Sequence, residues 1–541
     1  MTAKAPGTPT GGKAKDAQLV LLTLAAGQFL MALDSSVMNV SIATVAEDIG
    51  TTVSGLQGAI TAYTLVMAML MIIGGKVGAL VGRRRAFMIG CVIYGCGSLT
   101  TSLAPNLPVL LLGWSFLEGV GAALILPAIV ALVASNFAVE RRPAAYGLVA
   151  AAGAVAIAVG PLIGGVATTF FSWRWVFAGE VVLVLAILVL GRRMADAPPG
   201  HRPRIDVLGA VLSALGIGLF VFGVLRTSEW GWFVPKAGAP SWCGLSPVVW
   251  LMLAGLFLVW LFFRWEARQV ARGSEPLVDP ELMRNRQLTG GLTMFLFQYL
   301  VQMGVFFVVP LYLSVALGLS AVKTGVLILP LSISLLAAAI GIPRFRPEAS
   351  PRRVVKFGIL SMFAGAVVLL ILLDEDSGAA VVTVPLLLIG LGMGALASQL
   401  GAVTVSAVPD EQSAEVGGIQ NTVTNLGASI GTAVAGSILI TVLTASFLAT
   451  IEHSTVIPEE VKSQANVRLT AGAPFLSDAQ LTAALEDAGA KSDVTQAALD
   501  ANATARIDGL RAALGILALA ALTALFFTQR IPATQPGSPR P

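Results

Sequence analysis

The sequence predicts an all-α membrane protein with fourteen transmembrane helices. Of its 541 residues, 56% are hydrophobic and only 12% are charged, whereas a soluble domain carries roughly twice that charged fraction. Apolar runs of about 20 residues recur along the chain, and each is long enough to cross ~30 Å of hydrocarbon as a helix. Lys and Arg are concentrated in alternate connections, as the positive-inside rule expects for a protein that crosses the bilayer repeatedly.

The spans are bounded by charged or turn residues. The first run is longer than the apolar core of a secretory signal and has no convincing cleavage site, so we expect it to be retained as a span. The fourteen runs lie near 18–45, 54–75, 86–103, 107–135, 144–169, 172–191, 206–226, 247–267, 287–313, 320–343, 352–373, 378–405, 415–446 and 508–528.

The distribution of basic residues predicts the orientation of the chain. With the N-terminus inside, the inner segments hold 25 of the 34 Lys and Arg residues. This asymmetry persists from loop to loop, which predicts a multi-pass protein of the inner (cytoplasmic) membrane with both termini in the cytoplasm. The excess of Arg over Lys in an Ala-, Gly- and Val-rich chain hints at a bacterial source.

Composition excludes several other classes of function. The net charge is +4 and the pI is about 9.0, but the positive charge lies in membrane loops, so no nucleic-acid partner is expected. Cys91, Cys96 and Cys243 do not have the number or spacing of a disulfide framework or a metal site. The chain has no nucleotide loop, metal cluster or nucleophile triad, and His201 and His453 lie in loops. We therefore expect no enzyme activity, metal or cofactor.

Three carboxylates are the leading candidates for the working site. Asp34, Glu118 and Glu180 are the only acids inside apolar spans, and no base lies in those cores. A charge at the bilayer centre costs about 2.5–3.5 kcal/mol, so such residues usually mark a transport path. We expect Asp34 and Glu118 to bind both protons and substrate, with Glu180 nearer the outer surface as a gate or secondary proton-coupling site. The alternative is a structural role, with Glu180 paired to Arg174.

Four motifs resemble those of the major facilitator superfamily, in its fourteen-span drug:proton antiporter branch. Residues 33–40 resemble the first-span motif of that branch, and residues 172–177, which include Trp173-Arg174-Trp175, are typical of its sixth span. Two further motifs are expected to control conformation. One resembles the inner-loop signature of the superfamily and includes Gly75, Gly82, Arg83 and Arg84. The other resembles its antiporter signature and includes Gly160, Pro161, Gly164 and Gly165. The antiporter-like motif at 160–165 is either a hinge or seal between the bundles or a site of close helix packing.

The resemblance implies a major facilitator fold of two six-helix bundles plus a central inserted pair of helices. The long outer loop in the second bundle has a net charge of −4 and is either a surface helical hairpin or a substrate-binding lid. The implied segments are a cytoplasmic tail at 1–17, an N-terminal bundle at 18–191, a linker with two inserted helices at 192–286, a C-terminal bundle at 287–528 with the outer loop 447–507, and a second cytoplasmic tail at 529–541.

The chain also departs from the family pattern. Ala79 and Leu80 stand where the inner-loop signature usually carries an acid and a base, so the charge latch of the outward-open state must be weakened or replaced. Ser115 and Glu118 stand where the family has a buried base and an amide, and Glu180 replaces part of an Asn-x-Pro motif. The first bundle therefore gains acids and loses a base.

The second bundle has no embedded acid or base. Its amides suit varied substrates through hydrogen bonds, although most of them are expected to tie helices together. Gln298 and Gln302 lie one turn apart and close to Tyr299, so we expect these three to bind substrate.

The sequence thus predicts a proton-coupled exporter of amphipathic drugs or antibiotics, cationic or neutral, that works by alternating access. Its partners would be a small amphipathic substrate, protons and membrane lipids, and the chain would act as a monomer. One alternative is a translocator of a lipid or lipid-linked metabolite on the same fold. Another is a sensor or scaffold that transports nothing, which would leave the intramembrane acids unexplained.

Overall fold

The computed structural model describes residues 11–51, 53–195, 205–236, 238–375, 377–454, 457–458, 462, 477–487 and 491–535. Within these ranges the chain is helical apart from turns, connections and one isolated bridge between Trp242 and Leu245. The prediction of an all-α fold is confirmed. Most of the predicted N-terminal tail, His201 with its Pro-rich connection, and much of the loop 447–507 lie outside the described residues.

The first half of the described chain begins with the helices of one bundle and continues into the inserted pair. Its elements are α1 (Gly11–Asp48), α2 (Val53–Val81), α3 (Arg83–Ser102), α4 (Leu107–Leu110), the π-helical segment η1 (Leu111–Glu118), α5 (Gly119–Asn136), α6 (Arg142–Phe170), α7 (Arg174–Gly191), α8 (Val207–Leu225), α9 (Thr227–Trp230) and α10 (Pro247–Ala271).

The second half forms the other bundle and its extension. Its main elements are α11 (Arg286–Leu311), the π-helical η4 (Tyr312–Ala316), α12 (Ala321–Phe345), α13 (Pro351–Leu372), α14 (Thr383–Val405), the short η6 (Asp410–Gln412), α15 (Ser413–His453), α17 (Asp478–Asp487) and α18 (Ser492–Phe527).

Thirteen helical segments of the described chain are long and apolar enough to cross a membrane. The remaining predicted span, 86–103, lies in α3, which begins with three arginines and ends with Ser and Thr residues. α3 nevertheless runs alongside α5 and α7 inside the first bundle. We therefore count α3 as the fourteenth span because of its position in the fold, although its hydropathy does not indicate a span.

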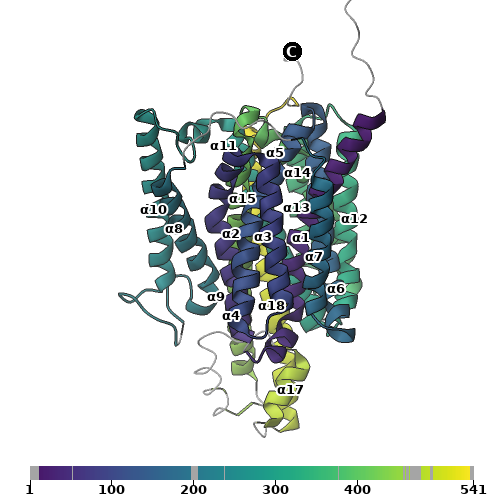
Figure 1. Ribbon diagram of the computed structural model, residues 1–541. Coiled ribbons are helices and arrows are strands. Elements are labelled where there is room, and N and C mark those ends of the chain that lie inside the picture. Colours follow the sequence, from purple (N-terminus) through teal and green to yellow (C-terminus); the bar gives the residue numbers. More distant parts are fainter. Residues whose placement is uncertain are drawn as a thin grey trace, which may run out of the picture.

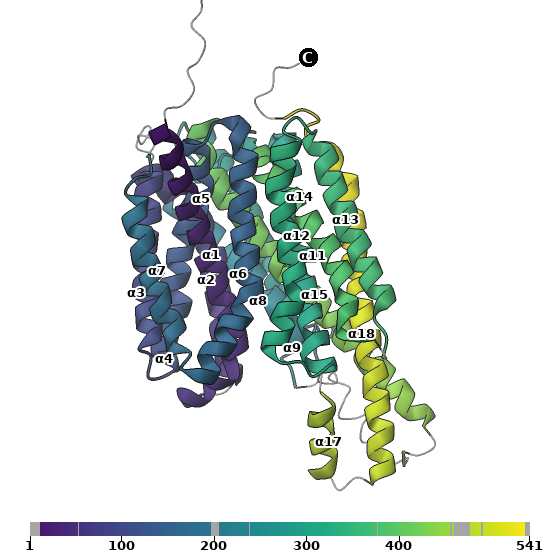
Figure 2. The same ribbon diagram turned by 90° about the vertical axis from the view of Figure 1, so that its right-hand side faces the viewer.

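The spans form two groups with a pair of helices beside them. α1, α2, α3, α5, α6 and α7 form the first group, and α11 to α15 with α18 form the second (Figures 1 and 2). α8 and α10 pack against each other, and α8 also contacts α2 and α15. The inserted pair therefore stands at one side of the molecule, in contact with both groups (Figure 1).

Local sequence signals explain where the helices of the linker region begin. Asp206 accepts a hydrogen bond from the backbone N–H of Gly209 at 3.0 Å and caps α8. Ser246 followed by Pro247 starts α10, and Asn285 accepts from two backbone N–H groups at the start of α11. Such side chains satisfy backbone donors that have no partner within the helix.

The outer loop begins and ends within helices. α15 continues to His453 and α18 already begins at Ser492, so both helices run beyond the predicted span limits. Ser446 donates to Asp508 at 2.6 Å, and Arg506 pairs with Asp478 of α17 at 2.7 Å. The parts of this region that the structure describes form a helical extension below the bundles (Figure 1).

Asp48 joins the end of α1 to the start of α7. Its carboxylate accepts hydrogen bonds from Arg174 and, at 3.0 Å, from Trp173 Nε1. The hydrogen bond from Arg174, followed by that from Trp173, lowers the pKa of Asp48 from its usual 3.8. The associated stability is therefore present above about pH 4 and is lost as the pH falls through the lowered pKa.

We expect Asp48→Asn to lower the melting temperature slightly at neutral pH. The Asp48 side chain is 44% exposed, so solvent screening limits the change in the free energy of unfolding to about 1 kcal/mol or less. The difference should shrink as the pH falls below about 4. Thermal unfolding of both proteins at neutral and acidic pH measures it, and a difference that grows toward acidic pH would contradict this account.

Candidate functional site

Three buried carboxylates from three helical segments meet in the first bundle. Asp34 comes from α1, Glu118 ends η1 and Glu180 lies in α7. One oxygen of each lies within 4.8 Å of an oxygen of each of the others, and the three residues are 0%, 0% and 2% exposed. The structure thus brings together the three acids predicted from sequence. Glu180 belongs to the same buried cluster as the other two acids, and its expected role as a gate or secondary proton-coupling site stays a prediction.

Close helix contact brings Glu118 to this position. η1 is a π-helical segment between α4 and α5, and such segments redirect side chains and occur often at functional sites. It packs on α3 at Gly97 and Gly113. A Cβ atom at Gly97 would lie 2.6 Å from Glu118 Cγ and 2.7 Å from the Gly113 carbonyl oxygen, so α3 and η1 can approach this closely only because residue 97 is glycine.

Each acid has neutral hydrogen-bond donors on one of its oxygens. Trp114 Nε1 donates to Asp34 Oδ1 at 2.7 Å, and Thr101 Oγ1 donates to Glu118 Oε1 at 3.2 Å. Glu180 Oε2 accepts two further hydrogen bonds, from the Tyr94 hydroxyl at 3.2 Å and from Ser98 Oγ at 3.1 Å.

The second oxygen of each acid is buried and has no hydrogen-bond partner among the described residues. These atoms are Asp34 Oδ2, Glu118 Oε2 and Glu180 Oε1. No described Lys or Arg forms an ion pair with any of the three acids, and Arg174 pairs with Asp48 rather than Glu180. The cluster therefore has acceptor capacity that the protein itself does not fill.

Electrostatics makes it costly to ionise the whole cluster. Two full negative charges at 4.8 Å repel by about 3 kcal/mol even at an effective dielectric constant of 20, and burial removes the hydration of each charge. Three such pairs exist and no base compensates them. The cluster must therefore retain protons or take up a cation, which is the chemistry expected of an ion-coupling site.

An aromatic pair forms one wall of the cluster. Tyr63 of α2 stacks on Trp114 with ring centroids 5.3 Å apart and an interplanar angle of 7°. The Tyr63 hydroxyl faces the Asp34 carboxylate, but among the described residues it makes no hydrogen bond of normal geometry. Tyr63 and Trp114 were not predicted from the sequence, and neither were Tyr94, Ser98 and Thr101. Ser98 and Thr101 lie one turn apart, but the end of α3 contains other Ser and Thr residues, so the pair does not stand out.

The amides predicted to bind substrate lie in the other bundle. Gln298 and Gln302 of α11 are 4% and 6% exposed, and Gln298 Oε1 has no hydrogen-bond partner among the described residues. Tyr299 is partly buried against the core of the second bundle. These three residues belong to the other bundle from the carboxylates, and their role in substrate binding remains a prediction.

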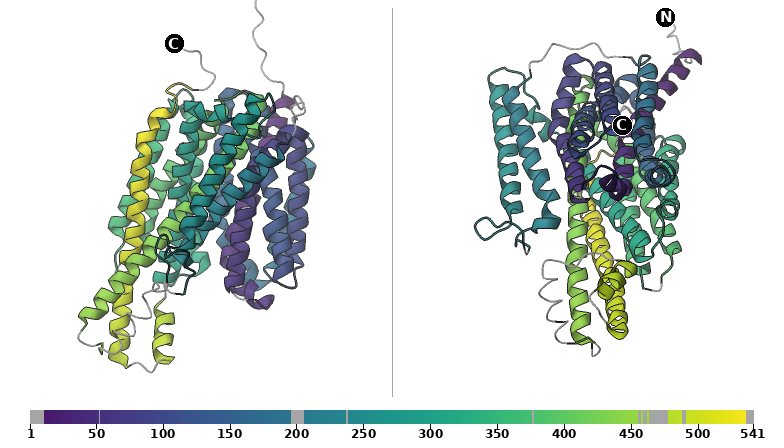
Figure 3. Two further views of the ribbon diagram at one scale, coloured as in Figure 1. Left: turned by 90° about the vertical axis from the view of Figure 1, so that its left-hand side faces the viewer. Right: turned by 60° about the horizontal axis from the view of Figure 1, so that its bottom comes forward.

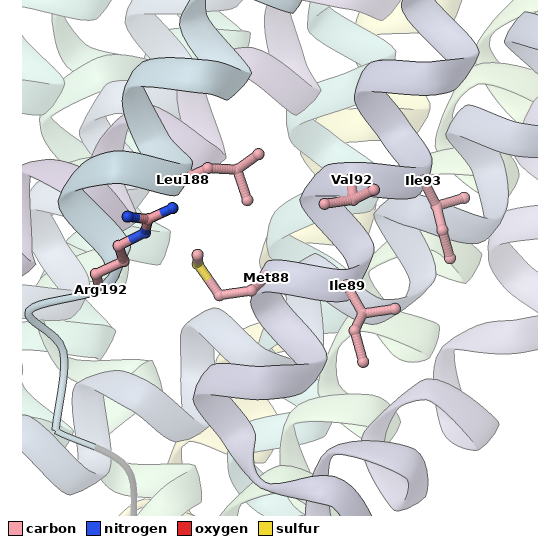
Figure 4. Close-up of a pocket in the computed structure, with 6 residues that line it drawn as sticks. All are labelled: Met88, Ile89, Val92, Ile93, Leu188 and Arg192. Atoms are coloured by element: carbon pink, nitrogen blue, oxygen red, sulfur yellow. The ribbon is translucent and has the colours of Figure 1, made fainter.

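A groove of about 380 Å³ runs between α3 and α7. Its lining is apolar except for Arg192, and none of the predicted site residues contributes to it (Figure 4). The residues that line it are Met88, Ile89, Val92, Ile93, Leu188 and Arg192.

The two bundles touch at the end where the described chain begins and finishes, which we call the terminal end. At this end Arg142 of α6 pairs with Asp410 at 2.9 Å and also donates to the Ala134 carbonyl at 2.6 Å. Arg83 donates to the backbone carbonyl of Asp410. Asp410 precedes α15 in the second bundle, so these hydrogen bonds join the two bundles at the terminal end.

Further contacts close the same end. A Cβ atom at Gly75 of α2 would lie 2.6 Å from the Ala414 carbonyl oxygen of α15, so α2 and α15 cross almost backbone to backbone. Lys76 donates to the Pro276 carbonyl at 2.6 Å, and the Asp279 N–H donates to Glu415 at 3.0 Å. The segment that follows the inserted pair therefore bonds to both bundles.

The closest approaches of α6 to the second bundle among the described residues lie in its first half, where Tyr146 meets Gly401 and Gly147 meets Ala339. The ribbons of the two bundles converge at the terminal end and diverge toward the opposite end (Figures 2 and 3). This conformation is closed at the terminal end.

The remaining motif residues have separate positions. Gly82 links α2 to α3 with φ of 101°, a backbone angle that favours glycine, and Arg84 donates to the Met194 carbonyl at 3.1 Å. Gly160 and Gly164 pack against Ser36 and Val37 of α1. These contacts lie within the first bundle rather than between bundles. Gly165 is partly buried, and the side chain of Pro161 lies outside the described residues.

Comparison with known proteins identifies relatives that match most of this chain. The Major Facilitator Superfamily profile matches residues 24–234 and 198–432. The chain is 30% identical over 441 residues to the puromycin resistance protein pur8 of Streptomyces alboniger, covering 80% of this chain and 84% of that protein. It is 29% identical over 432 residues to a probable actinorhodin transporter of Streptomyces coelicolor, covering 78% and 72%.

Two further comparisons agree with these. The lincomycin resistance protein of Streptomyces lincolnensis is 30% identical over 430 residues, covering 78% of this chain and 84% of that protein. Among solved structures, the human organic anion transporter MFSD10 (TETRAN) superposes with a TM-score of 0.58 at 13% identity, covering 96% of this chain and all of that one. The structural likeness concerns the fold alone.

Proposed function

Because this chain belongs to the Major Facilitator Superfamily, we propose that it exports small amphipathic drugs or antibiotics, cationic or neutral, in exchange for protons. The observation that carries the proton coupling is the cluster of Asp34, Glu118 and Glu180, which is buried, lacks a base and leaves one oxygen of each acid unpartnered. The relatives that confer resistance to, or transport, antibiotics support export as the direction. They fit this function better than lipid translocation.

The charge distribution supports the orientation that we propose. The protein crosses the membrane many times, and we assign it to the cytoplasmic membrane with both termini in the cytoplasm. The terminal end carries Arg83, Arg84 and Arg142 together with other basic residues, as the positive-inside rule expects for a cytoplasmic face. The conformation closed at that end is then the outward-facing one.

In the proposed cycle, protons neutralise the cluster when it faces outward. Neutralisation removes the repulsion among the three carboxylates, so the first bundle can reorient without carrying uncompensated charge. Facing inward, the cluster loses its protons and favours a cationic or polarisable cargo. The two bundles rock about the bound substrate. We assign its contacts in the second bundle to Gln298, Gln302 and Tyr299.

Reconstituted protein tests the proposal directly. Proteoliposomes with an imposed pH gradient are supplied in parallel with a cationic dye, a neutral antibiotic and a labelled lipid. One proton moving down 100 mV can support roughly a 50-fold gradient of a neutral cargo. We expect gradient-dependent movement of a dye or antibiotic that a protonophore abolishes. Movement of the lipid alone, or movement that ignores the pH gradient, would overturn the proposal.

A further inference from the structure

We propose that the carboxylate cluster is also a binding site for a hard metal cation of the size of Na⁺ or Ca²⁺. The ligands would be Asp34, Glu118 and Glu180. The inference deepens the proposed function because it concerns the same site, but binding can be measured whether or not transport occurs.

The geometry of the acids suits a single ion. One oxygen of each carboxylate lies within 4.8 Å of the others. A triangle with sides of that length has a centre about 2.8 Å from each corner, close to the 2.3–2.6 Å at which Ca²⁺ binds oxygen. Small side-chain adjustments would bring all three into contact with one ion. Mg²⁺ requires about 2.0–2.1 Å and near-ideal octahedral geometry, which these positions fit less well.

A separate side chain points to a ligand at this place. The Tyr63 hydroxyl is nearly fully buried and faces Asp34, yet no hydrogen bond of normal geometry engages it among the described residues. Tyr63 is not one of the acids and comes from another helix. Its oxygen faces Asp34, one member of the cluster, so Tyr63 could add a neutral oxygen ligand to a cation bound there.

The donor set selects the class of cation. The polar side chains around the cluster that could act as ligands are the acids themselves and the hydroxyls of Tyr63, Tyr94, Ser98 and Thr101. Oxygen ligands without thiolate or imidazole favour hard cations over zinc or copper. Trp114 already donates its N–H to Asp34 Oδ1, which leaves Oδ2 available.

Charge balance links cation binding to protons. The titratable groups that face the site are the acids on α1, η1 and α7, Tyr63 on α2 and Tyr94 on α3. Carboxylates bind a metal only when deprotonated, so cation entry displaces protons and protonation displaces the cation.

Equilibrium binding to the purified full-length protein tests the inference. Radioactive Na⁺ and Ca²⁺ are titrated at about pH 8 with choline chloride holding the ionic strength, and Mg²⁺ and K⁺ serve as competitors. We expect saturable binding of Na⁺ or Ca²⁺ to the wild type. Asp34→Asn and Glu118→Gln should each weaken it by at least about tenfold, since loss of a ligand costs no less than loss of a residue that orients one.

Two further variants make the result specific. Glu266→Gln removes another fully buried acid with an unpartnered oxygen, located in α10 outside the cluster, and should leave binding unchanged. Tyr63→Phe should weaken binding while the acids stay intact. Absence of saturable binding, or equal binding in the wild type and both acid variants, overturns the inference. Gradient-driven transport that persists without cation binding would retain the proposed function and reject only the cation site.

Discussion

Asp34→Asn is expected to abolish proton-driven export while leaving the folded protein as stable as the wild type, or more so. The amide keeps the shape of the side chain and can still accept from Trp114, so the local packing should survive. It removes one charge from a buried cluster in which each pair of full charges repels by about 3 kcal/mol. Loss of activity without loss of stability would separate a coupling role from a structural one.

The measurement combines transport with unfolding. Export driven by a pH gradient should fall by at least about tenfold in Asp34→Asn and in Glu118→Gln, while the melting temperature of each stays level or rises. Glu281→Gln offers a matched control, because that acid is 76% exposed and far from the spans' interior. Unchanged gradient-driven export in Asp34→Asn would show that the acid serves packing only.

Much of the fold could be predicted because the bilayer imposes simple constraints. Apolar length and loop charge are visible in the sequence, and they predict the number and the direction of the spans. The limits of α15 and α18 were less visible because both helices continue beyond their apolar portions. Hydropathy does not report where a helix ends once it has left the hydrocarbon.

Some residues of the site could be predicted from the sequence, but the contacts among them could not. A carboxylate in an apolar run stands out, so Asp34, Glu118 and Glu180 could be selected from sequence. Their meeting in one cluster depends on how three helices rotate and pack, which no local pattern records. The hydrogen-bonding partners of these acids are Tyr, Trp, Ser and Thr side chains, which are ordinary components of membrane helices.

The contacts of Asp410 with the first bundle were also hidden. Asp410 lies 327 residues from Arg83 along the chain, in a short turn before α15. Ala79 and Leu80 predict a charge latch that is weakened or replaced, but no local pattern indicates which residues would replace it. Only the packing of the two bundles shows that Asp410 accepts from Arg83 through its backbone carbonyl and from Arg142 through its carboxylate.

Gly75→Ala is expected to open the terminal end and to reduce export by about tenfold or more. The added Cβ would lie 2.6 Å from the Ala414 carbonyl oxygen and 3.2 Å from the Gly418 Cα atom. Both neighbours belong to backbone, so they cannot move aside as a flexible side chain would, and α2 must shift away from α15. Overpacking of this kind typically costs about 1–3 kcal/mol.

The overpacking free energy of Gly75→Ala destabilises only the conformation that is closed at the terminal end, which makes the substitution informative. Gly75 meets the second bundle only while the terminal end is closed, so the clash destabilises that state and shifts the population toward the other. Hydrogen exchange should accelerate in α2 and α15 near the contact. Gly78→Ala is the matched control, because its added Cβ would meet its nearest atoms at 3.8 Å. If the two variants exchange and transport alike, the α2–α15 crossing does not control the equilibrium between states.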